Sequence, residues 1–322
     1  MKKIVVNSND ADKRLDSFLK KVLYNIPDSL IYKYIRKKKI KVNRKKVPGS
    51  YRLLENDVIE LYINDEFFEK SSNKYEFKNT SFSLDVVYED ENILIINKPA
   101  GLIVHPDIRE ESECLINRIK SYLYNRKEYD PQNENSFSPA LINRIDRNTS
   151  GIVLAAKNAK TLSILNQKMK KREIHKSYMC IVCGVPSDSS GVLKAYLSKN
   201  ESENKVYIRN TPFANSKVIL TEYKVLEKSK RFSLLDVNLL TGRTHQIRAH
   251  LAYMGYPILG DGKYGINSLN KLMKYKYQAL CSYKVKFDFK SDSGILEYLN
   301  GRSFVLPKEK IWFIKDFYEC FT

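Results

Sequence analysis

An aspartate between two arginines is the strongest chemical feature of this sequence. Asp146 lies in the polar cluster 143–149, with Arg144 two residues before it and Arg147 directly after it. Such clusters are usually turns, because Asn, Asp, Ser and Gly favour loops. Nearby positive charge, however, keeps a carboxylate ionised and able to act as a nucleophile or a base. Since the β-prone run 152–156 follows, we expect Asp146 to lie at the mouth of a strand.

Other patterns suggest metal or phosphate binding but lack the required form. Cys180 and Cys183 have the spacing of half a zinc site, yet no second pair accompanies them. His245 and His250 are five residues apart, which would place them on different faces of a helix. The stretch GDGKYG at 260–265 lacks the spacing of a phosphate-binding loop. We therefore expect no metal and no cofactor, and we interpret these residues as core, packing or turn positions.

The charge of the chain indicates a polyanionic partner. Its 322 residues include 56 Lys and Arg against 37 Asp and Glu, a formal net charge of +19. Residues 1–62 hold 16 basic and 7 acidic residues, and the tract 28–52 holds ten basic residues and a single acid. Such concentration favours a phosphate backbone as counter-charge over a plain solvated surface. We expect phosphate contacts here from Lys37, Lys38 and Arg44.

Cysteine usage and hydropathy indicate the compartment. The five cysteines are odd in number and mostly scattered, which argues against a disulfide framework and fits a reducing environment. No apolar run reaches the length of a membrane helix, and the first residues lack the apolar segment of a secretion signal. We therefore expect a cytoplasmic protein that does not associate with membranes.

The N-terminal region is expected to form two helices and a short strand. Apolar residues recur at helical spacing over 12–24, and Pro27 interrupts the pattern. Asp28 or Ser29 is then expected to cap a second helix. The strand is expected at 58–63.

These elements divide the chain into a small first domain, 1–63, and a large second domain, 81–322. The intervening residues 64–80 are polar and without clear periodicity, which is typical of a linker.

The second domain is expected to be α+β, with a mainly antiparallel sheet and helices between the strands. Thr244 is expected to cap the last of these helices, and residues 124–139 to form a surface loop. The expected strands cover 85–89, 93–97, 151–156, 178–183 and 232–240, and the expected helices cover 115–123, 161–169 and 244–253.

Four blocks in order resemble the RluA-type pseudouridine synthase family. The family signature is His-Arg-Leu-Asp, one or two variable residues, Thr-Ser-Gly and a strand ending in Ala-Lys. This sequence reads Asn-Arg-Ile-Asp-Arg-Asn-Thr-Ser-Gly, with Asn143 in place of histidine and Ile145 in place of leucine. The other blocks are INKPAGLIVHP, KSYMCIVCG with Tyr178, and TGRTHQIRAHLAYMGYPILGDGKYG at 241–265.

The resemblance extends to the first domain and to a subgroup. Residues 12–62 resemble the αL RNA-binding module first described in ribosomal protein S-four. Within the family, Asp-Arg-Asn-Thr-Ser-Gly and LSKN at 197–200 are most similar to the subgroup called ribosomal large subunit pseudouridine synthase C.

The resemblance to this family implies a role for Asp146 and its neighbours. Asp146 would be the catalytic group, either attacking the nucleotide covalently or removing a proton from the ribose. Because the target base must leave its stack, Tyr178 would stack on the flipped uracil. Arg144 would fill the gap that the base leaves.

The last block implies the remaining site residues. Arg248 would pair with Asp146 and hold it ionised, with Arg243 as the competing candidate. Ile247 would close the pocket.

Three functions are compatible with these residues. The first is an RNA pseudouridine synthase that isomerises uridines in large-subunit ribosomal RNA, acting as a monomer. The alternative is a noncatalytic RNA-binding ribosome assembly factor on the same fold, suggested by the basic first domain and by Asn143. The third is a metal-dependent ribonuclease using Asp146 and Asp261, although these carboxylates are not grouped as two-metal sites require.

Overall fold

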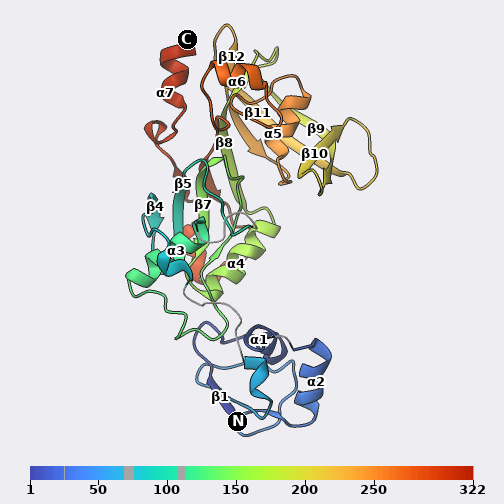
Figure 1. Cartoon of the computed structure of the whole chain (residues 1–322), viewed down its shortest axis with the longest axis vertical. Helices are drawn as coiled ribbons and strands as arrows, with labels where there is room; N and C mark the ends of the chain where they lie inside the picture. Colours follow the sequence, from blue (N-terminus) through green and yellow to red (C-terminus); the bar gives the residue numbers. More distant parts are fainter. Residues whose placement is uncertain (25, 69–75, 108–112, 322) are drawn as a thin grey trace.

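The computed structural model describes residues 1–24, 26–68, 76–107 and 113–321, and it places the first domain at one end of an elongated molecule (Figure 1). Residues 69–75 of the predicted linker lie outside the described residues. On either side of them, Phe67 and Phe68 pack against the first domain and Phe77 is buried in the second.

The first domain is built by the predicted apolar stripes. Two helices, α1 (Leu15–Val22) and α2 (Asp28–Arg36), pack on a three-stranded antiparallel sheet. The sheet has the order β1-β3-β2, with β1 (Lys2–Val5), β2 (Ile40–Val42) and β3 (Val58–Leu61). Leu15, Phe18 and Leu19 are fully buried, so one face of α1 forms this core.

The predicted cap of α2 was wrong. The residue before the helix is Pro27, and no side chain provides a cap hydrogen bond. Asp28 is instead the first helical residue, where its carboxylate pairs with Lys20 of α1. A negative charge in the first turn still complements the helix dipole.

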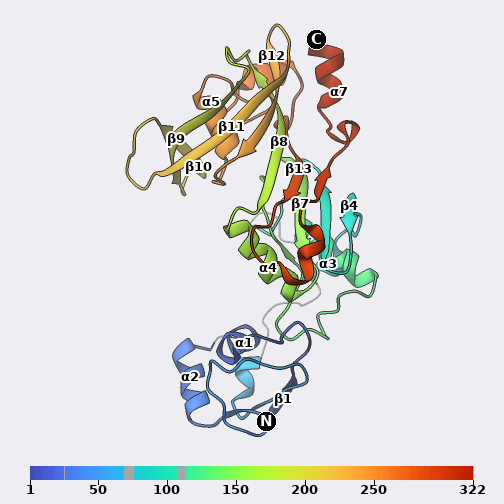
Figure 2. The same cartoon turned by 180° about the vertical axis from the view of Figure 1, so that it is seen from behind.

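The second domain is α+β around one mixed sheet, as predicted, with an order that brings distant strands together (Figure 2). Its main path is β10-β9-β11-β12-β8-β13-β7-β5-β4, with β14 on β13 and β6 on β7. All pairings are antiparallel except that of β7 with β13. The strands are β4 (Val86–Glu89), β5 (Ile93–Lys98), β6 (Ala140–Leu141), β7 (Ser150–Ala156), β8 (Ile174–Cys183), β9 (Ser190–Asn200), β10 (Lys205–Arg209), β11 (Lys217–Lys228), β12 (Phe232–Leu239), β13 (Leu280–Phe287) and β14 (Ser303–Val305).

The α-helices of the second domain are α3 (Leu115–Asn125), α4 (Ala159–Lys170), α5 (Gln246–Tyr253), α6 (Asn267–Leu272) and the short α7 (Ile314–Asp316). The predicted helices 115–123 and 161–169 are confirmed as α3 and α4, each slightly longer than predicted. The third prediction, 244–253, starts two residues before the observed α5.

The sheet separates two hydrophobic cores, and the two spaced cysteines show this division. Cys180 packs in one cluster and Cys183 in the other, as positions three apart on a strand face opposite sides. Both thiols are buried and free. They are therefore core residues, as predicted.

Gly151 lies where the parallel pair β7 and β13 approaches most closely. Its φ is +109°, and a Cβ built there would lie 2.3 Å from the carbonyl oxygen of Ser282. Both the positive φ and the contact exclude a side chain, because the obstacle is backbone that cannot rotate away. This close approach explains why glycine follows Thr149 and Ser150 in the signature.

We predict that Gly151→Ala lowers the free energy of unfolding by about 3 kcal/mol or more, through strain and overlap together. Gly255→Ala is the matched control: its φ is +88° but no atom lies within 4 Å of the added Cβ, so it should cost only about 1 kcal/mol. Denaturant midpoints of the two variants measure the difference. Equal losses would contradict the importance of the close approach.

Candidate active site

Asp146 sits in a short loop held from three directions. The backbone N–H of Thr149 donates to the carbonyl of Asp146 at 3.1 Å, which closes a turn. The Thr149 hydroxyl accepts a hydrogen bond from the side chain of Gln278 at 2.9 Å. Lys98, at the end of β5, donates to the carbonyl of Arg147 at 2.9 Å. The loop is thus attached to β5 and to the segment before β13.

The ammonium group of Lys98 hydrogen-bonds to two loops, the Asp146 loop and the loop that follows β5. Its Nζ also donates to the carbonyls of Pro99 and Leu102, at 2.8 and 2.7 Å, so its three donors are all used. The side chain is fully buried. Burial lowers the pKa of Lys98 to about 7, against the opposing effect of the Asp146 charge.

Asn143, which stands where the family signature has histidine, bonds to the backbone of β7. Its side chain is buried, and its Oδ1 accepts the backbone N–H of Leu154 on β7 at 2.8 Å. Its amide nitrogen lies 3.4 Å from the carbonyl of Ile152, as a donor. The loop geometry before Asp146 is therefore supported without a histidine.

Arg248 of α5 joins the Asp146 loop to a second carboxylate. One terminal nitrogen of Arg248 donates to Oδ2 of Asp146 at 2.7 Å. Its Nε and other terminal nitrogen donate to both oxygens of Asp261, at 2.7 and 2.9 Å. Burial opposes the charge of this guanidinium, but the bonds and charges of Asp261 and Asp146 raise the pKa of Arg248. The guanidinium is consequently oriented on both sides.

Asp261 is the anchor of this arrangement. It is fully buried, and its Oδ1 also accepts the backbone N–H groups of Lys263 and Tyr264, at 2.8 and 3.1 Å. Burial would raise its pKa, whereas the pairing with Arg248 lowers the pKa of Asp261 below its ordinary value. The Asp146 side chain, by contrast, is 28% exposed. One carboxylate thus orients the arginine and the other can meet a substrate.

The start of α5 is tied to the sheet by a buried glutamine. Gln246 accepts from the Thr241 hydroxyl at 2.9 Å and donates to the Leu220 carbonyl at 2.9 Å. The predicted cap, Thr244, was wrong: the residue before the helix is His245, in the left-handed region at φ 54°. The Gln246 side chain supplies the local contacts instead, accepting the N–H of Arg243 at 3.1 Å.

His245 lies at the edge of the site. Its Nδ1 is 2.9 Å from the Tyr264 hydroxyl, and its Nε2 is 4.0 Å from Oδ2 of Asp146. Burial lowers the pKa of His245, although Asp146 opposes this shift. A non-glycine residue in this backbone region next to a catalytic candidate is strain of the kind that functional sites hold.

Tyr178 and Ile247 form the apolar side. Tyr178 on β8 and Ile247 on α5 are both buried in the same hydrophobic cluster. Burial raises the pKa of the Tyr178 phenol, and the Asp146 charge acts in the same direction. Asp146 is thus bonded to Arg248 and acts by its charge on Tyr178, which shares a hydrophobic cluster with Ile247.

The arginines adjacent to Asp146 in the sequence are not its partners. Arg147 pairs with Asp107 at 3.3 Å, and the Arg144 side chain is exposed. Arg243, the competing candidate, is also exposed. The ion pair to Asp146 comes from Arg248, 102 positions away.

The basic residues predicted for RNA contact are on the surface of the first domain. Lys37 and Lys38 follow α2, and Arg44 lies at the tip of a two-residue turn. Asn43 and Arg44 both have positive φ, 49° and 66°, as a type I′ turn requires. All three cations are exposed, and no described carboxylate lies within ion-pair distance of them. They are available for phosphate.

Sequence reasoning missed Lys98 as a member of the site and considered Asp261 only as a metal ligand of a nuclease. Both lie inside the quoted blocks, so the blocks carried a signal, but only the fold places them beside Asp146. With Arg248 between them, Asp146 and Asp261 face a cation rather than a metal. Among the described residues no group of three or more His, Cys, Asp or Glu side chains is arranged to hold a metal ion.

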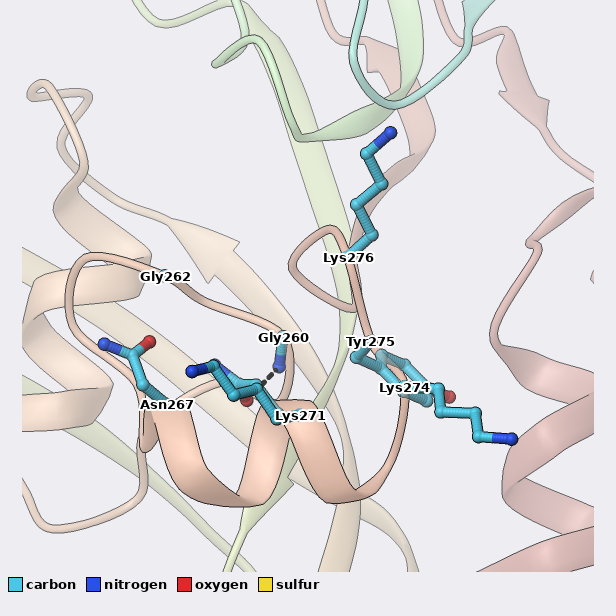
Figure 3. A pocket seen from close by; sticks show the side chains of 8 residues that line it. Gly260, Gly262, Asn267, Lys271, Lys274, Tyr275 and Lys276 are labelled. Atoms are coloured by element: carbon cyan, nitrogen blue, oxygen red, sulfur yellow. Dashed lines mark hydrogen bonds between the residues drawn. The ribbon is translucent and has the colours of Figure 1, made fainter.

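A pocket adjoins the turn that carries Asp261 (Figure 3). Gly260 and Asn270 line it, and the N–H of Gly260 donates to Asn270 Oδ1 at 2.7 Å. The side chains of Lys271, Lys274 and Lys276 extend from it in different directions (Figure 3). The pocket is therefore lined by basic side chains that do not converge on one point.

Comparisons with known proteins find matches in both parts of the chain. A family model described as RNA pseudouridylate synthase matches residues 92–253, and one described as S4 domain matches residues 13–59. An uncharacterized RNA pseudouridine synthase of Mycoplasma capricolum subsp. capricolum is 36% identical over 316 residues, 97% of this chain and 99% of that protein. Ribosomal large subunit pseudouridine synthase C of Buchnera aphidicola subsp. Baizongia pistaciae is 32% identical over 277 residues, 84% of this chain and 83% of that protein.

A solved structure supports the fold. Human RNA pseudouridylate synthase domain containing 4 aligns with a TM-score of 0.55 at 23% identity, over 72% of this chain and 91% of that one. Separately, no helix among the described residues has both the length and the apolar character needed to cross a bilayer.

The chain belongs to the RNA pseudouridylate synthase family. It is an RluA-type pseudouridine synthase, an isomerase, with an N-terminal S4 domain. The noncatalytic alternative rested partly on the missing histidine, and Asn143 fills that position structurally.

We predict that Arg248→Lys lowers kcat for pseudouridine formation by about 10²-fold or more, because an ammonium cannot hold both carboxylates in one plane. Tritium release from RNA labelled at C5 of uridine measures this loss. Arg172→Lys, at an exposed position after α4, is the control. An unchanged kcat in a folded Arg248→Lys protein would contradict the proposal that the guanidinium orients Asp146.

Proposed function

We propose that this enzyme isomerises specific uridines in large-subunit ribosomal RNA, with Asp146 as the catalytic group. The observation that carries the proposal is the part-exposed Asp146 carboxylate, held at 2.7 Å by a guanidinium that is itself anchored on buried Asp261. The likeness to ribosomal large subunit pseudouridine synthase C supports the choice of RNA. The sequence features at 146–151 and 197–200 support the same subgroup.

The reaction needs one carboxylate and no redox partner. The bond between N1 of uracil and C1′ of ribose breaks, the base rotates, and C5 bonds to C1′. The hydrogen at C5 leaves as a proton, and N1, which has lost its bond to C1′, takes up a proton, so the product is an isomer. Asp146 starts the reaction either by attacking the nucleotide covalently or by removing a ribose proton.

The remaining residues position the nucleotide. Tyr178 would stack on the flipped uracil and Ile247 would close the apolar side of the pocket, returning part of the unstacking cost. Arg144, exposed beside the Asp146 loop, would occupy the place that the base leaves. Arg243, exposed before α5, would contact a phosphate.

The S4 domain supplies affinity by charge. Lys37, Lys38 and Arg44 are exposed and unpaired by any described carboxylate, so each can neutralise a phosphate without first breaking an ion pair. Contacts of this type position folded RNA and carry little base preference. Base choice is then left to the active site and to the shape of the RNA.

We predict that Asp146→Asn abolishes tritium release from ribosomal RNA labelled at C5 of uridine, a loss of more than about 10³-fold, since the amide is neither nucleophile nor base. Asp288→Asn removes a part-exposed carboxylate that follows β13 and pairs with Lys290, outside the site, and it should leave the rate unchanged. Substantial release by Asp146→Asn would refute the catalytic assignment. Release from transfer RNA alone would refute the choice of substrate.

A second prediction concerns salt. Replacing Lys37, Lys38 and Arg44 together by alanine should lower the slope of log binding constant against log salt by about 2, because three phosphate contacts are lost. Filter binding over a range of salt concentrations measures the slope. Lys228, Lys230 and Arg231, exposed around the β11–β12 hairpin, provide a control triple. An unchanged slope in the first variant would show that these three residues of the S4 domain do not contact RNA phosphates.

A further inference from the structure

A loop of the catalytic domain reaches the S4 domain. Residues 133–136 belong to the connection from α3 to β6, which was predicted as a surface loop. In both views this connection extends down to the region of α1 (Figures 1 and 2). Eight hydrogen bonds between described residues join segment 5–13 to residues 133–136 and 159.

A buried carboxylate lies at the centre of this contact. Asp10 is fully buried and accepts hydrogen bonds from the Ser136 hydroxyl and from the Asn135 amide, the latter at 2.9 Å. Lys13 donates to Asp10 at 3.2 Å and to Ser136 at 2.7 Å. Asn135 also donates to the carbonyl of Val5 at 2.8 Å. A buried charge with this many partners is satisfied only when the loop is docked.

A second group of bonds sets the orientation. The Asn9 amide nitrogen donates to Glu134 at 2.6 Å, and its oxygen accepts the N–H of Ala159, the first residue of α4, at 2.9 Å. Asn7 donates to the other oxygen of Glu134 at 3.1 Å. Burial raises the pKa of Glu134 and lowers that of Lys13, as expected where charged groups leave water. Asn9 therefore contacts two separate elements of the catalytic domain.

The contact is polar rather than apolar. The hydrophobic cluster of the S4 domain, among described residues, draws its members from residues 4–68 alone. The two domains therefore share no hydrophobic core among the described residues. Directional hydrogen bonds from several sides nevertheless permit only one relative orientation of the domains. The docked arrangement is thus specific and separable.

We propose that Asn9, Asp10, Lys13, Glu134, Asn135 and Ser136 form an interdomain latch that determines which uridines are modified. The latch holds the basic surface of the S4 domain at one position relative to Asp146. RNA bound by that surface then presents only uridines at a matching position, whereas two units without a fixed geometry would reach a range of positions. This inference deepens the proposed function and rests on RNA docking by the S4 domain.

The first test needs no RNA. Asn9→Ala with Asn135→Ala removes one amide from each side of the latch, and Asn125→Ala with Asn300→Ala removes two amides that bond within the catalytic domain. Small-angle scattering should show the docked shape for the unaltered protein and the control, and an expanded distribution for the latch variant. Separated domains in the unaltered protein, or a docked latch variant, would overturn the proposal.

The second test concerns site choice. On a short hairpin RNA with one target uridine, the latch variant should keep kcat within about twofold, because the catalytic residues are untouched. On full-length ribosomal RNA, mapping of modified positions should show a loss of preference for the target over other uridines of about tenfold, with an unchanged melting temperature of the catalytic domain. An unaltered map would overturn the proposal. Failure of the unaltered enzyme to modify ribosomal RNA would instead refute the proposed substrate, while the scattering result would stand.

Discussion

The guanidinium of Arg248 is the constraint on which the site depends. It is shared between a fully buried carboxylate, Asp261, and a part-exposed one, Asp146. Buried charges are tolerated only when paired and hydrogen-bonded, so neither the arginine nor Asp261 can be placed alone. The turn at 260–265, helix α5 and the Asp146 loop must therefore adopt their positions together. The catalytic candidate is positioned by a chain of charges rather than by its sequence neighbours.

The parts of the site that the sequence predicted are those carried by motifs. Asp146, Tyr178 and Arg248 occupy the blocks that resemble the family, and the structure brings them together. Asp261 was considered only as a metal ligand of a nuclease, and residues 260–265 only as a turn. Sequence spacing alone does not show that a carboxylate in this turn will pair with an arginine of the preceding helix. Arg147 shows the converse: it is adjacent to Asp146 in the sequence, yet its guanidinium pairs with Asp107.

The fold class was predicted correctly, and the errors concern the ends of individual helices and the contacts of one loop. Apolar periodicity located α1, α3 and α4 because burial of one face is a local pattern. The predicted first residues of helices were less accurate. At α5, the start of the helix is set by the hydrogen bonds of Gln246 to β11, which the local sequence around Thr244 does not show. The loop 124–139 was read as a surface segment from its polarity. Its amides instead bond to the S4 domain, and polarity alone does not distinguish solvent from a polar partner.

The parallel pairing of β7 with β13 has a consequence for when activity arises. Ser150 and Gly151 lie beside Cys281 and Ser282, about 130 positions later in the chain. Contacts so distant in sequence form late, after the loop-closure entropy of the intervening segment has been overcome. During synthesis, the RNA-binding module can fold long before the ribosome has made β13. A nascent chain would therefore acquire the capacity to hold RNA well before it acquires the capacity to modify it.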